Sequence, residues 1–331
     1  MSETLPSLAQ PLSVHDSYRL IRDDCGILEL TQRQAVILTG GDRNGWLQGQ
    51  ITNDLRYFAP GAFLQFCLCS ATGQLEAIGS LWAMDDELVV ITDPAGAEVL
   101  LRRADKMVIL EEVSAVPSPD RLICVQGPNA TERLGDLVSL PQLNSVTAEI
   151  LGVPVRVLRS NRTGSGGWVV MVPAGGDRLV AELADRFPTI ASEAYAMASM
   201  EFGSPQFGVD TDSKTLLPEL GAAFESATIS YKKGCYLGQE VLMRLHSRGH
   251  VNRQWMGMYT DTLVTPGDAI THARRPDAGV ITSAFESPDF GFIAAGYVRR
   301  EVAYSGEEVT VQSASGTVGA ELVEMPILRL G

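Results

Sequence analysis

Short apolar runs recur along the first part of the chain, and each leads through glycine, aspartate or proline into apolar residues at helical spacing. These runs cover 34–39, 87–92 and 121–126. The change from a dense apolar run to a helical period predicts three strands that each precede a helix. We expect Asp42 to cap the first helix, and the second to open at Asp93 and reach Ala104. Pro128 suits the first turn of the third.

The later pattern predicts further elements of both kinds. We expect a strand at 107–113 and helices at 176–187 and 192–200. Past Arg253 the period shortens, and turn residues separate apolar runs at 279–285, 292–299 and 308–312. Short strands at such regular intervals are typical of a small antiparallel barrel.

The predicted elements divide the chain into three parts. Gly40 and Gly127 each follow a strand and precede a leucine by seven residues, which indicates two units of similar design. A chain of 331 residues also exceeds the size at which one hydrophobic core keeps growing. We therefore predict an α+β protein with α/β units at 1–115 and 116–250 and a barrel domain at 251–331.

Charge and hydropathy narrow the class of partner. The chain carries 26 Lys and Arg against 40 Asp and Glu, a net charge of −14. Such a charge repels phosphate backbones and anionic lipid, so we expect no direct nucleic-acid or membrane partner. The first twenty residues lack a basic stretch followed by an apolar run, and no apolar stretch approaches the roughly 20 residues of a membrane helix. These features predict a cytoplasmic protein.

The cysteines and histidines do not predict a metal site. Five cysteines at irregular spacing favour reduced thiols over a disulfide framework. Cys67 and Cys69 would face one side of a strand, but no second pair completes a tetrahedral set. His246 and His250 are four residues apart, with Gly249 between them and no acidic ligand at suitable spacing.

One window, residues 232–240, combines a thiol with two cations and two glycines. Cys235 follows Lys232, Lys233 and Gly234, and Gly238 lies three residues on. Adjacent ammonium groups favour a thiolate, and the glycines keep bulk away from it. The alternative is a buried, inert cysteine beside a solvated lysine pair.

Residues 233–240, KGCYLGQE, resemble the signature octapeptide of the YgfZ family, folate-binding proteins related to the aminomethyltransferase (T-protein) of the glycine cleavage system. The resemblance extends over most of the chain. It includes WLQGQITNDL (46–55), LICVQGPNA (122–130), RTGSGGWVVMVP (162–173), MEFGSPQFGVD (200–210), RGHVNR (248–253) and residues 279–299. It implies a three-domain folate-binding fold, with two ferredoxin-like α/β units followed by a C-terminal antiparallel β-barrel.

The resemblance also implies site residues and a cofactor, tetrahydrofolate or a one-carbon derivative. Glu201 matches the family's folate carboxylate, and one carboxylate can accept both N–H donors of a pterin edge. Asn53 and Asp54 would lie beside the folate, or else form a turn. Four cations would bind the glutamyl tail, unless they form a solvated face: Lys233, Arg244, Arg248 and Arg253. Cys235 would be the catalytic thiol.

The sequence departs from the transferase where that enzyme carries its acid. The family's GGxxDD-like segment corresponds to residues 73–78, and Ala77 and Ile78 cannot move a proton. Glu76 is nearby, but a shift of one or two residues on a strand changes face or depth. The departure predicts no glycine-dependent methylene transfer.

Three functions remain open on the sequence. The first is a folate-binding accessory protein for synthesis or repair of iron–sulfur clusters, including those of tRNA-modifying enzymes, with cluster proteins or assembly factors as partners. The second is a folate-dependent aminomethyl or methyl transferase. The third is a folate-binding scaffold without chemistry.

Overall fold

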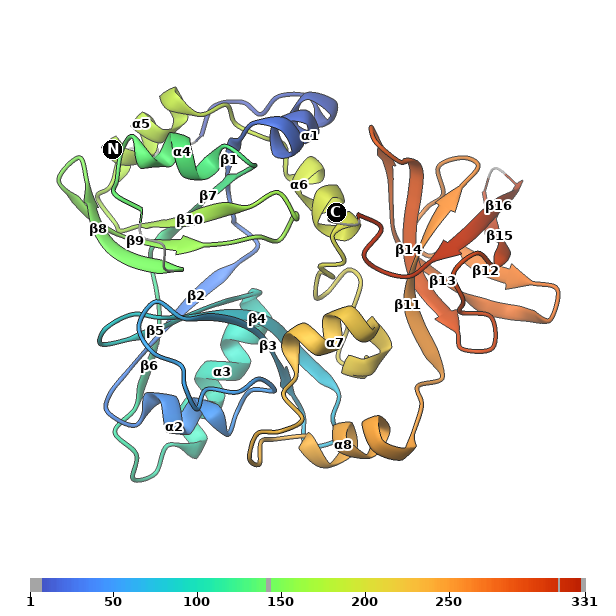
Figure 1. Ribbon diagram of the computed structural model, residues 1–331, viewed down its shortest axis with the longest axis horizontal. Coiled ribbons are helices and arrows are strands. Elements are labelled where there is room, and N and C mark those ends of the chain that lie inside the picture. Colours follow the sequence, from blue (N-terminus) through green and yellow to red (C-terminus); the bar gives the residue numbers. More distant parts are fainter. Residues whose placement is uncertain (1–7, 141–143, 315, 329–331) are drawn as a thin grey trace, which may run out of the picture.

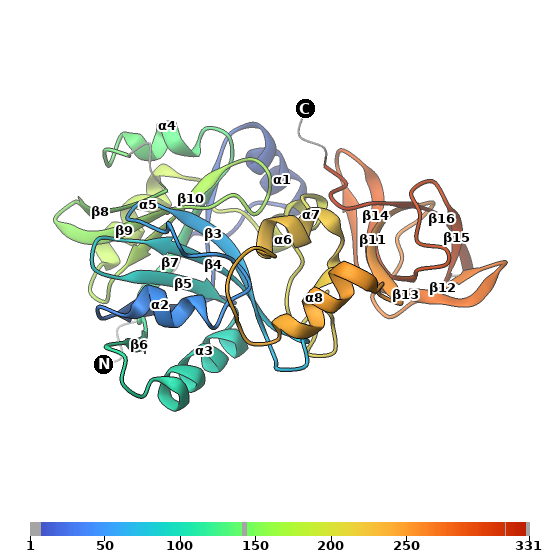
Figure 2. The ribbon, with the colours of Figure 1, turned by 60° about the horizontal axis from the view of Figure 1, so that its bottom comes forward.

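The computed structural model describes residues 8–140, 144–314 and 316–328, which form two α/β units and a barrel (Figure 1). The predicted fold class, mixed α/β with a C-terminal antiparallel barrel, is confirmed. Segments between the second unit and the barrel lie where the three parts meet, as both views show (Figures 1 and 2).

The first unit is a five-stranded antiparallel sheet with two helices. Its strand order is β3-β4-β5-β2-β6. The strands are β2 (Gln34–Thr39), β3 (Phe63–Cys69), β4 (Leu75–Ala83), β5 (Leu88–Thr92) and β6 (Ser114–Pro117), and the helices are α2 (Arg43–Gln48) and α3 (Pro94–Met107). As predicted, Asp93 caps α3, and its Oδ1 accepts a hydrogen bond from Gly96 N at 2.8 Å. Asp42 occupies the cap position of α2, but its carboxylate instead accepts from Glu112 N at 2.8 Å.

The second unit has the sheet order β1-β7-β10-β9-β8. Its elements are α1 (Val14–Asp23), β1 (Gly26–Glu29), β7 (Arg121–Gln126), α4 (Ala130–Gly135), β8 (Ser145–Ile150), β9 (Val153–Arg159), β10 (Gly167–Val172), α5 (Asp177–Arg186) and α6 (Ser192–Glu201). Because β1 pairs with β7, residues 26–29 belong to this sheet although they precede the first unit in sequence. The predicted division at residue 115 falls inside β6, which belongs entirely to the first sheet, and it places β1 in the first unit.

The barrel closes because β11 pairs with both β14 and β16. Its strands are β11 (Arg253–Thr260), β12 (Ala269–His272), β13 (Arg275–Ser287), β14 (Gly291–Arg299), β15 (Glu308–Ser313) and β16 (Gly316–Val323). A 3₁₀ helix (Leu217–Leu220), α7 (Ala222–Thr228) and α8 (Gln239–Arg248) connect α6 to β11.

Two local predictions are wrong. The apolar run 107–113 is no strand: α3 ends at Met107, an exposed loop follows, and β6 begins at Ser114. Pro128 precedes the cap residue Asn129 and so lies outside the first turn of α4.

Neither a membrane-spanning helix nor a metal-binding cluster is found in the described residues. No helix in the described residues is long and apolar enough to cross a membrane. Among the same residues, no group of three or more His, Cys, Asp or Glu side chains is arranged to hold a metal ion.

The loop of residues 232–238 fits closely against the first unit, and Gly238 is the position that requires glycine. Its φ is +86°, and an added Cβ would lie 2.5 Å from the carbonyl oxygen of Ser70. A side chain there would combine left-handed strain with a clash against main chain. Gly234, four residues earlier, has open space around it.

We therefore expect Gly238→Ala to lower the free energy of unfolding by about 2–4 kcal/mol, since strain and displacement of the Ser70 main chain add. Urea denaturation followed by far-UV circular dichroism measures the change. Gly234→Ala is the matched control and should stay within about 0.5 kcal/mol of the parent. Equal stability of the two variants would contradict the close fit of the loop.

Candidate functional site

A cavity of about 370 Å³ lies where the second unit meets the barrel. Its walls come from the β1–β2 connection, one face of α6, the loop after α6 and strand β13. Leu28, Leu30, Met200 and Phe285 supply much of its apolar surface. A cavity of this size with apolar walls and a few convergent polar groups is the usual form of a small-molecule site.

Two buried hydroxyl groups in the cavity wall have no partner in the described part of the chain. They are Tyr195 Oη and Ser199 Oγ, which lie one turn apart on α6. Tyr195 Oη lies beside the Cys124 thiol, and burial raises the pKa of Tyr195 above its usual range. Buried hydroxyls are normally satisfied, so two unpaired ones on side chains of the cavity wall suit a polar ligand that reaches them.

The cavity also holds charges of both signs. Asp210 accepts hydrogen bonds from Ser283 Oγ, from Thr282 Oγ1 at 3.1 Å and from Gln206 N at 2.9 Å. Burial raises the pKa of Asp210, while these hydrogen bonds oppose the shift. The site thus has a fixed carboxylate held between the barrel and the loop after α6.

Arg33 and Arg162 contribute the positive charge. Burial and the charge of Arg162 lower the pKa of the Arg33 guanidinium, which stays cationic because guanidinium is so strong a base. Arg162 Nη2 makes one long contact, 3.4 Å, to the Pro205 carbonyl oxygen. Two guanidinium groups that repel each other are arranged to gain from an anion between them.

Glu201, the predicted folate carboxylate, is not among the residues that line this cavity. It is fully buried at the end of α6. Oε1 accepts from Ser287 Oγ at 2.6 Å, and Oε2 accepts from Tyr18 Oη at 3.0 Å and pairs with Arg22. The carboxylate therefore joins α1, α6 and the barrel, and both of its oxygens already have donors.

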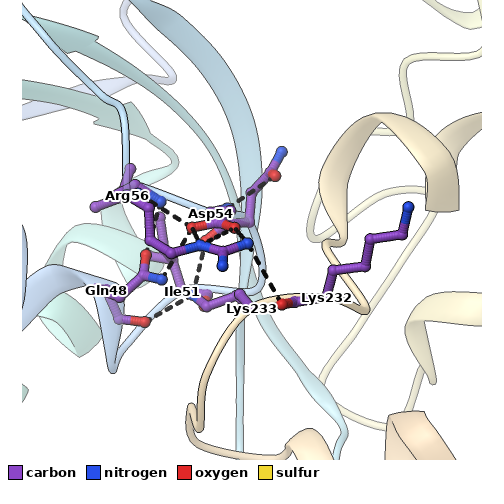
Figure 3. Close-up of polar contacts among 8 residues, drawn as sticks. Gln48, Ile51, Asp54, Arg56, Lys232 and Lys233 are labelled. Carbon is purple, nitrogen blue, oxygen red and sulfur yellow. Dashed lines mark hydrogen bonds and ion pairs between the residues drawn. The ribbon is translucent and has the colours of Figure 1, made fainter.

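Lys233 is buried and bonded to main chain. Its ammonium group donates to the carbonyl oxygens of Gln48, Ile51 and Asn53 at 2.6, 2.7 and 2.7 Å, around the C-terminal end of α2 (Figure 3). Burial lowers its pKa to about 8, and the charge of Asp54 opposes the shift. All three N–H bonds are used, so none remains for the predicted glutamyl tail.

Asn53 and Asp54 have structural partners as well. Asn53 Nδ2 donates to the carbonyl oxygens of Gln65 at 2.8 Å and Ala227 at 3.1 Å, which connects β3 to α7. Asp54 pairs with Arg56 and accepts from Gln48 Nε2 at 3.0 Å. Its contact with Arg56 lowers the pKa of Asp54 to about 2. The turn alternative for this segment agrees with these contacts.

Two of the three predicted arginines, Arg244 and Arg253, lie away from the cavity wall. Arg244 is exposed on α8. Arg248 ends α8, and its side chain lies outside the described part of the structure. Arg253 pairs with Glu219 at 3.0 Å and lies over the Tyr297 ring. The structure brings neither Arg244 nor Arg253 together with Glu201 or Asp210.

Cys235 is the exposed member of the five cysteines, and the other four are buried. Burial raises the pKa of Cys25 to about 11 and the pKa values of Cys69 and Cys124 to about 12. Lys233 and Tyr236 point into the protein on either side, so the loop leaves the Cys235 thiol in solvent. This excludes the buried-cysteine alternative.

The segment predicted to correspond to the transferase's acid, residues 73–78, leads into β4. Ala77 and Ile78 are buried in the cores of the first unit and of the junction. Glu76 pairs with the buried Arg103, which also donates to the Cys69 carbonyl oxygen at 2.6 Å. The nearest carboxylate is thus held by an ion pair.

Sequence reasoning missed the cavity residues. Arg162 and Asp210 lie in segments that the resemblance had identified, so those motifs were the available signal. Arg33, Tyr195 and Ser199 carried no local signal, because distant parts of the fold bring them together.

Comparison with known proteins agrees with this architecture. The family model described as the GCVT N-terminal domain matches residues 10–226, and that of the glycine cleavage T-protein C-terminal barrel domain matches residues 253–328. Aminomethyltransferase of Thermosynechococcus vestitus is 26% identical over 96% of this chain and 88% of its own length. That of Mycobacterium leprae strain TN is 25% identical over 98% and 90%.

Among solved structures, the glycine cleavage system aminomethyltransferase T from Bartonella henselae superimposes with a TM-score of 0.86. The match covers 97% of this chain and 91% of that one, at 19% sequence identity. At 19% sequence identity, this structural similarity establishes a shared fold and nothing about function.

We expect Lys233→Met to lower the free energy of unfolding by about 2–4 kcal/mol, because three main-chain carbonyl oxygens at the end of α2 lose a charged donor. Thermal or urea denaturation measures the loss. Lys232→Met is the matched control, since that side chain is exposed and points away from the cluster (Figure 3). A similar change in both variants would refute the assignment.

In the native protein near neutral pH, iodoacetamide should alkylate Cys235 before any other cysteine. Exposure favours this thiol, while burial and raised pKa values protect the rest. Peptide mass spectrometry over a time course identifies the order, and Cys235→Ser should remove the fast phase. Comparable native reactivity of Cys25, Cys67, Cys69 or Cys124 would show that burial does not control access.

Proposed function

The chain belongs to the GCVT family of glycine cleavage T-protein-like proteins. On that premise we propose that it binds a reduced folate in the cavity lined by α6. The bound folate would serve in aminomethyl or methyl transfer. The observation that carries the proposal is the cavity, whose wall brings the buried Asp210 carboxylate together with the side chains of Tyr195 and Ser199. Aminomethyltransferases among the relatives support the reaction class.

A pterin suits the polar groups of the cavity. Its 2-amino-pyrimidinone edge presents two adjacent N–H donors, and Asp210 lines the wall, as do Glu193 and Glu29, which pairs with Arg121. Both Asp210 oxygens already accept hydrogen bonds, as those of Glu201 do, so Asp210 is preferred for its place in the cavity wall. Tyr195 and Ser199 can complete the hydrogen bonds of the ring, whose flat face suits apolar neighbours such as Phe285. The folate would carry the one-carbon group, and these residues would hold and orient it.

Arg33 and Arg162 suit the carboxylates of the glutamyl tail. Forked guanidinium donors bind carboxylates in pairs of hydrogen bonds, and neither side chain has an acidic partner at ion-pair distance in the described structure. This assignment replaces Lys233, whose donors are used on main chain, and Arg253, which is paired with Glu219.

The second candidate is a folate-binding accessory protein for iron–sulfur cluster synthesis or repair. It is favoured by the exposed Cys235 thiol and by the ion pair that holds Glu76 in place of a free transferase acid. In this case the folate would bind in the same cavity, while Cys235 would react with iron, sulfide or a partner thiol.

Asp210→Asn should weaken tetrahydrofolate by about tenfold or more, because an amide replaces one acceptor by a donor. Isothermal titration calorimetry measures the affinity. Glu201→Gln is the informative comparison: it should lower stability through the loss of the Arg22 pair and change affinity less. The reverse order of affinities would restore Glu201 as the pterin carboxylate and remove Asp210.

Arg162→Ala should weaken tetrahydrofolate but leave binding of tetrahydrobiopterin, a reduced pterin without a glutamyl tail, nearly unchanged. The pair of ligands separates tail contacts from ring contacts in one titration series. Equal weakening of both ligands would show that Arg162 contacts the ring or supports the fold.

Two assays separate the candidate functions. If the protein is a transferase, folate-dependent one-carbon transfer should occur with an aminomethylated lipoyl carrier or a small methylamine and should fall in Asp210→Asn. If it is an accessory protein, folate binds without turnover. Cys235→Ala then keeps folding and folate affinity yet fails to support iron–sulfur enzyme activity in cells that lack the native protein.

A further inference from the structure

The first unit carries an exposed apolar ridge on the side away from the barrel. Eleven large apolar side chains are exposed in the described residues, and four of them belong to one ten-residue stretch. They are Met107, Ile109, Leu110 and Val116, with exposed fractions of 42, 82, 95 and 50%. This stretch includes residues 107–113, whose apolar composition led to the wrong strand prediction. Its exposed apolar side chains do not pack into a hydrophobic core.

The ridge is held in place by a network of main-chain contacts. The Glu111 carboxylate accepts from the amides of Ile109 at 2.9 Å and Leu110 at 3.1 Å. Glu112 N donates to Asp42 Oδ2 at 2.8 Å, and Asp42 N donates back to the Glu112 carbonyl oxygen at 3.2 Å. The loop is thereby ordered in a form that presents aliphatic side chains to solvent, which is a cost unless something covers them.

An open sheet edge continues the ridge. β6 is the last strand of its sheet, and within the described chain nothing pairs with its outer side (Figure 1). Ser118 N donates to the Ala35 carbonyl oxygen, and bonded residues alternate in an antiparallel ladder. The N–H and C=O of Ala115 and the C=O of Pro117 therefore point away from β2, ready for an added strand.

A surface pocket lies at the start of this edge. It has a volume of about 330 Å³ and is lined by Asp42, Gly45, Trp46, Leu110 and Glu111. Trp46 is buried, with an exposed fraction of 6%. Its Nε1–H has no hydrogen-bond partner in the described residues. The pocket thus combines an apolar wall with two carboxylates that also accept hydrogen bonds from main-chain amides.

Charge decides between possible occupants. Asp42 and Glu111 line the pocket, Glu112 is next in the chain, and the whole chain carries −14. A two-fold contact between copies would place these carboxylates against themselves, which disfavours a second copy of this chain. A segment with lysine or arginine beside apolar residues would instead meet complementary charge.

We propose that β6 and the ridge of residues 107–116 form a docking surface for an extended, basic segment of a partner protein. The segment adds as a strand beside β6, places an apolar side chain against Leu110 and Trp46, and brings its cations to the acidic rim. The surface lies on the opposite side of the first unit from the barrel, so a partner bound there leaves the folate cavity open (Figures 1 and 2).

The test uses two synthetic peptides, one alternating valine with arginine and one alternating valine with glutamate. Fluorescence polarisation should show binding of the arginine peptide only, weakened by salt. Ile109→Ser with Leu110→Ser should weaken it about tenfold through lost apolar contact. Tyr304→Ser also replaces an exposed large side chain by serine, but on the barrel. It is the control and should bind the peptide as the parent does.

Amide chemical-shift changes confined to 42–46 and 107–117 would place the peptide on the ridge. Binding of both peptides, binding of neither, or unchanged affinity in the serine variant would overturn the proposal. A dimer in sedimentation analysis that the serine variant abolishes would also overturn it, in favour of a second copy as the occupant. Folate affinity, measured in parallel, should be the same in all of these variants.

Discussion

The buried Glu201 carboxylate is the interaction on which the arrangement of the second unit and the barrel most depends. It receives donors from Tyr18 and Arg22 on α1 and from Ser287 on the barrel, while its carbonyl oxygen accepts from Leu328 N at 2.8 Å. A buried charge is tolerated only when it is fully paired, so α1, α6 and the barrel must meet in one geometry. That geometry fixes the face of α6 that lines the cavity.

A second buried charge fixes the loop that carries Cys235. The Lys233 ammonium satisfies three carbonyl oxygens at the end of α2, where a helix leaves its last carbonyls without partners. Since Lys233 is anchored and Gly238 permits the tight turn beside Ser70, the residues between them have little freedom. The exposed position of Cys235 follows from these two anchors. Lys233, which the resemblance assigns to a ligand, thus also holds this loop in place.

Family membership does not by itself determine the chemistry of this protein. The match to the T-protein models and the superposition on a solved aminomethyltransferase concern the whole architecture. The position that would supply the acid is occupied by Ala77 and Ile78, and the neighbouring Glu76 is held by Arg103. A fold can keep a ligand cavity while the reacting groups around it change, which is why the cavity and the exposed thiol support different candidate functions.

The sequence by itself determined the features that depend on near neighbours. The strands at Gln34–Thr39 and Arg121–Gln126, the cap at Asp93 and the barrel could be predicted because apolar period, turn residues and capping act over a few positions. The octapeptide likewise singled out Cys235, whose thiol is exposed in the structure. The run at 107–113 misled because an apolar composition reports burial only if another element covers it. Long-range packing decided the rest: it placed β1 in the second sheet, turned Glu201 and Lys233 into structural anchors, and brought Arg33, Arg162, Tyr195 and Asp210 to one cavity. Such contacts join residues far apart in sequence, so no local pattern encodes them, and only the folded chain shows which charges are paired and which remain open to a ligand.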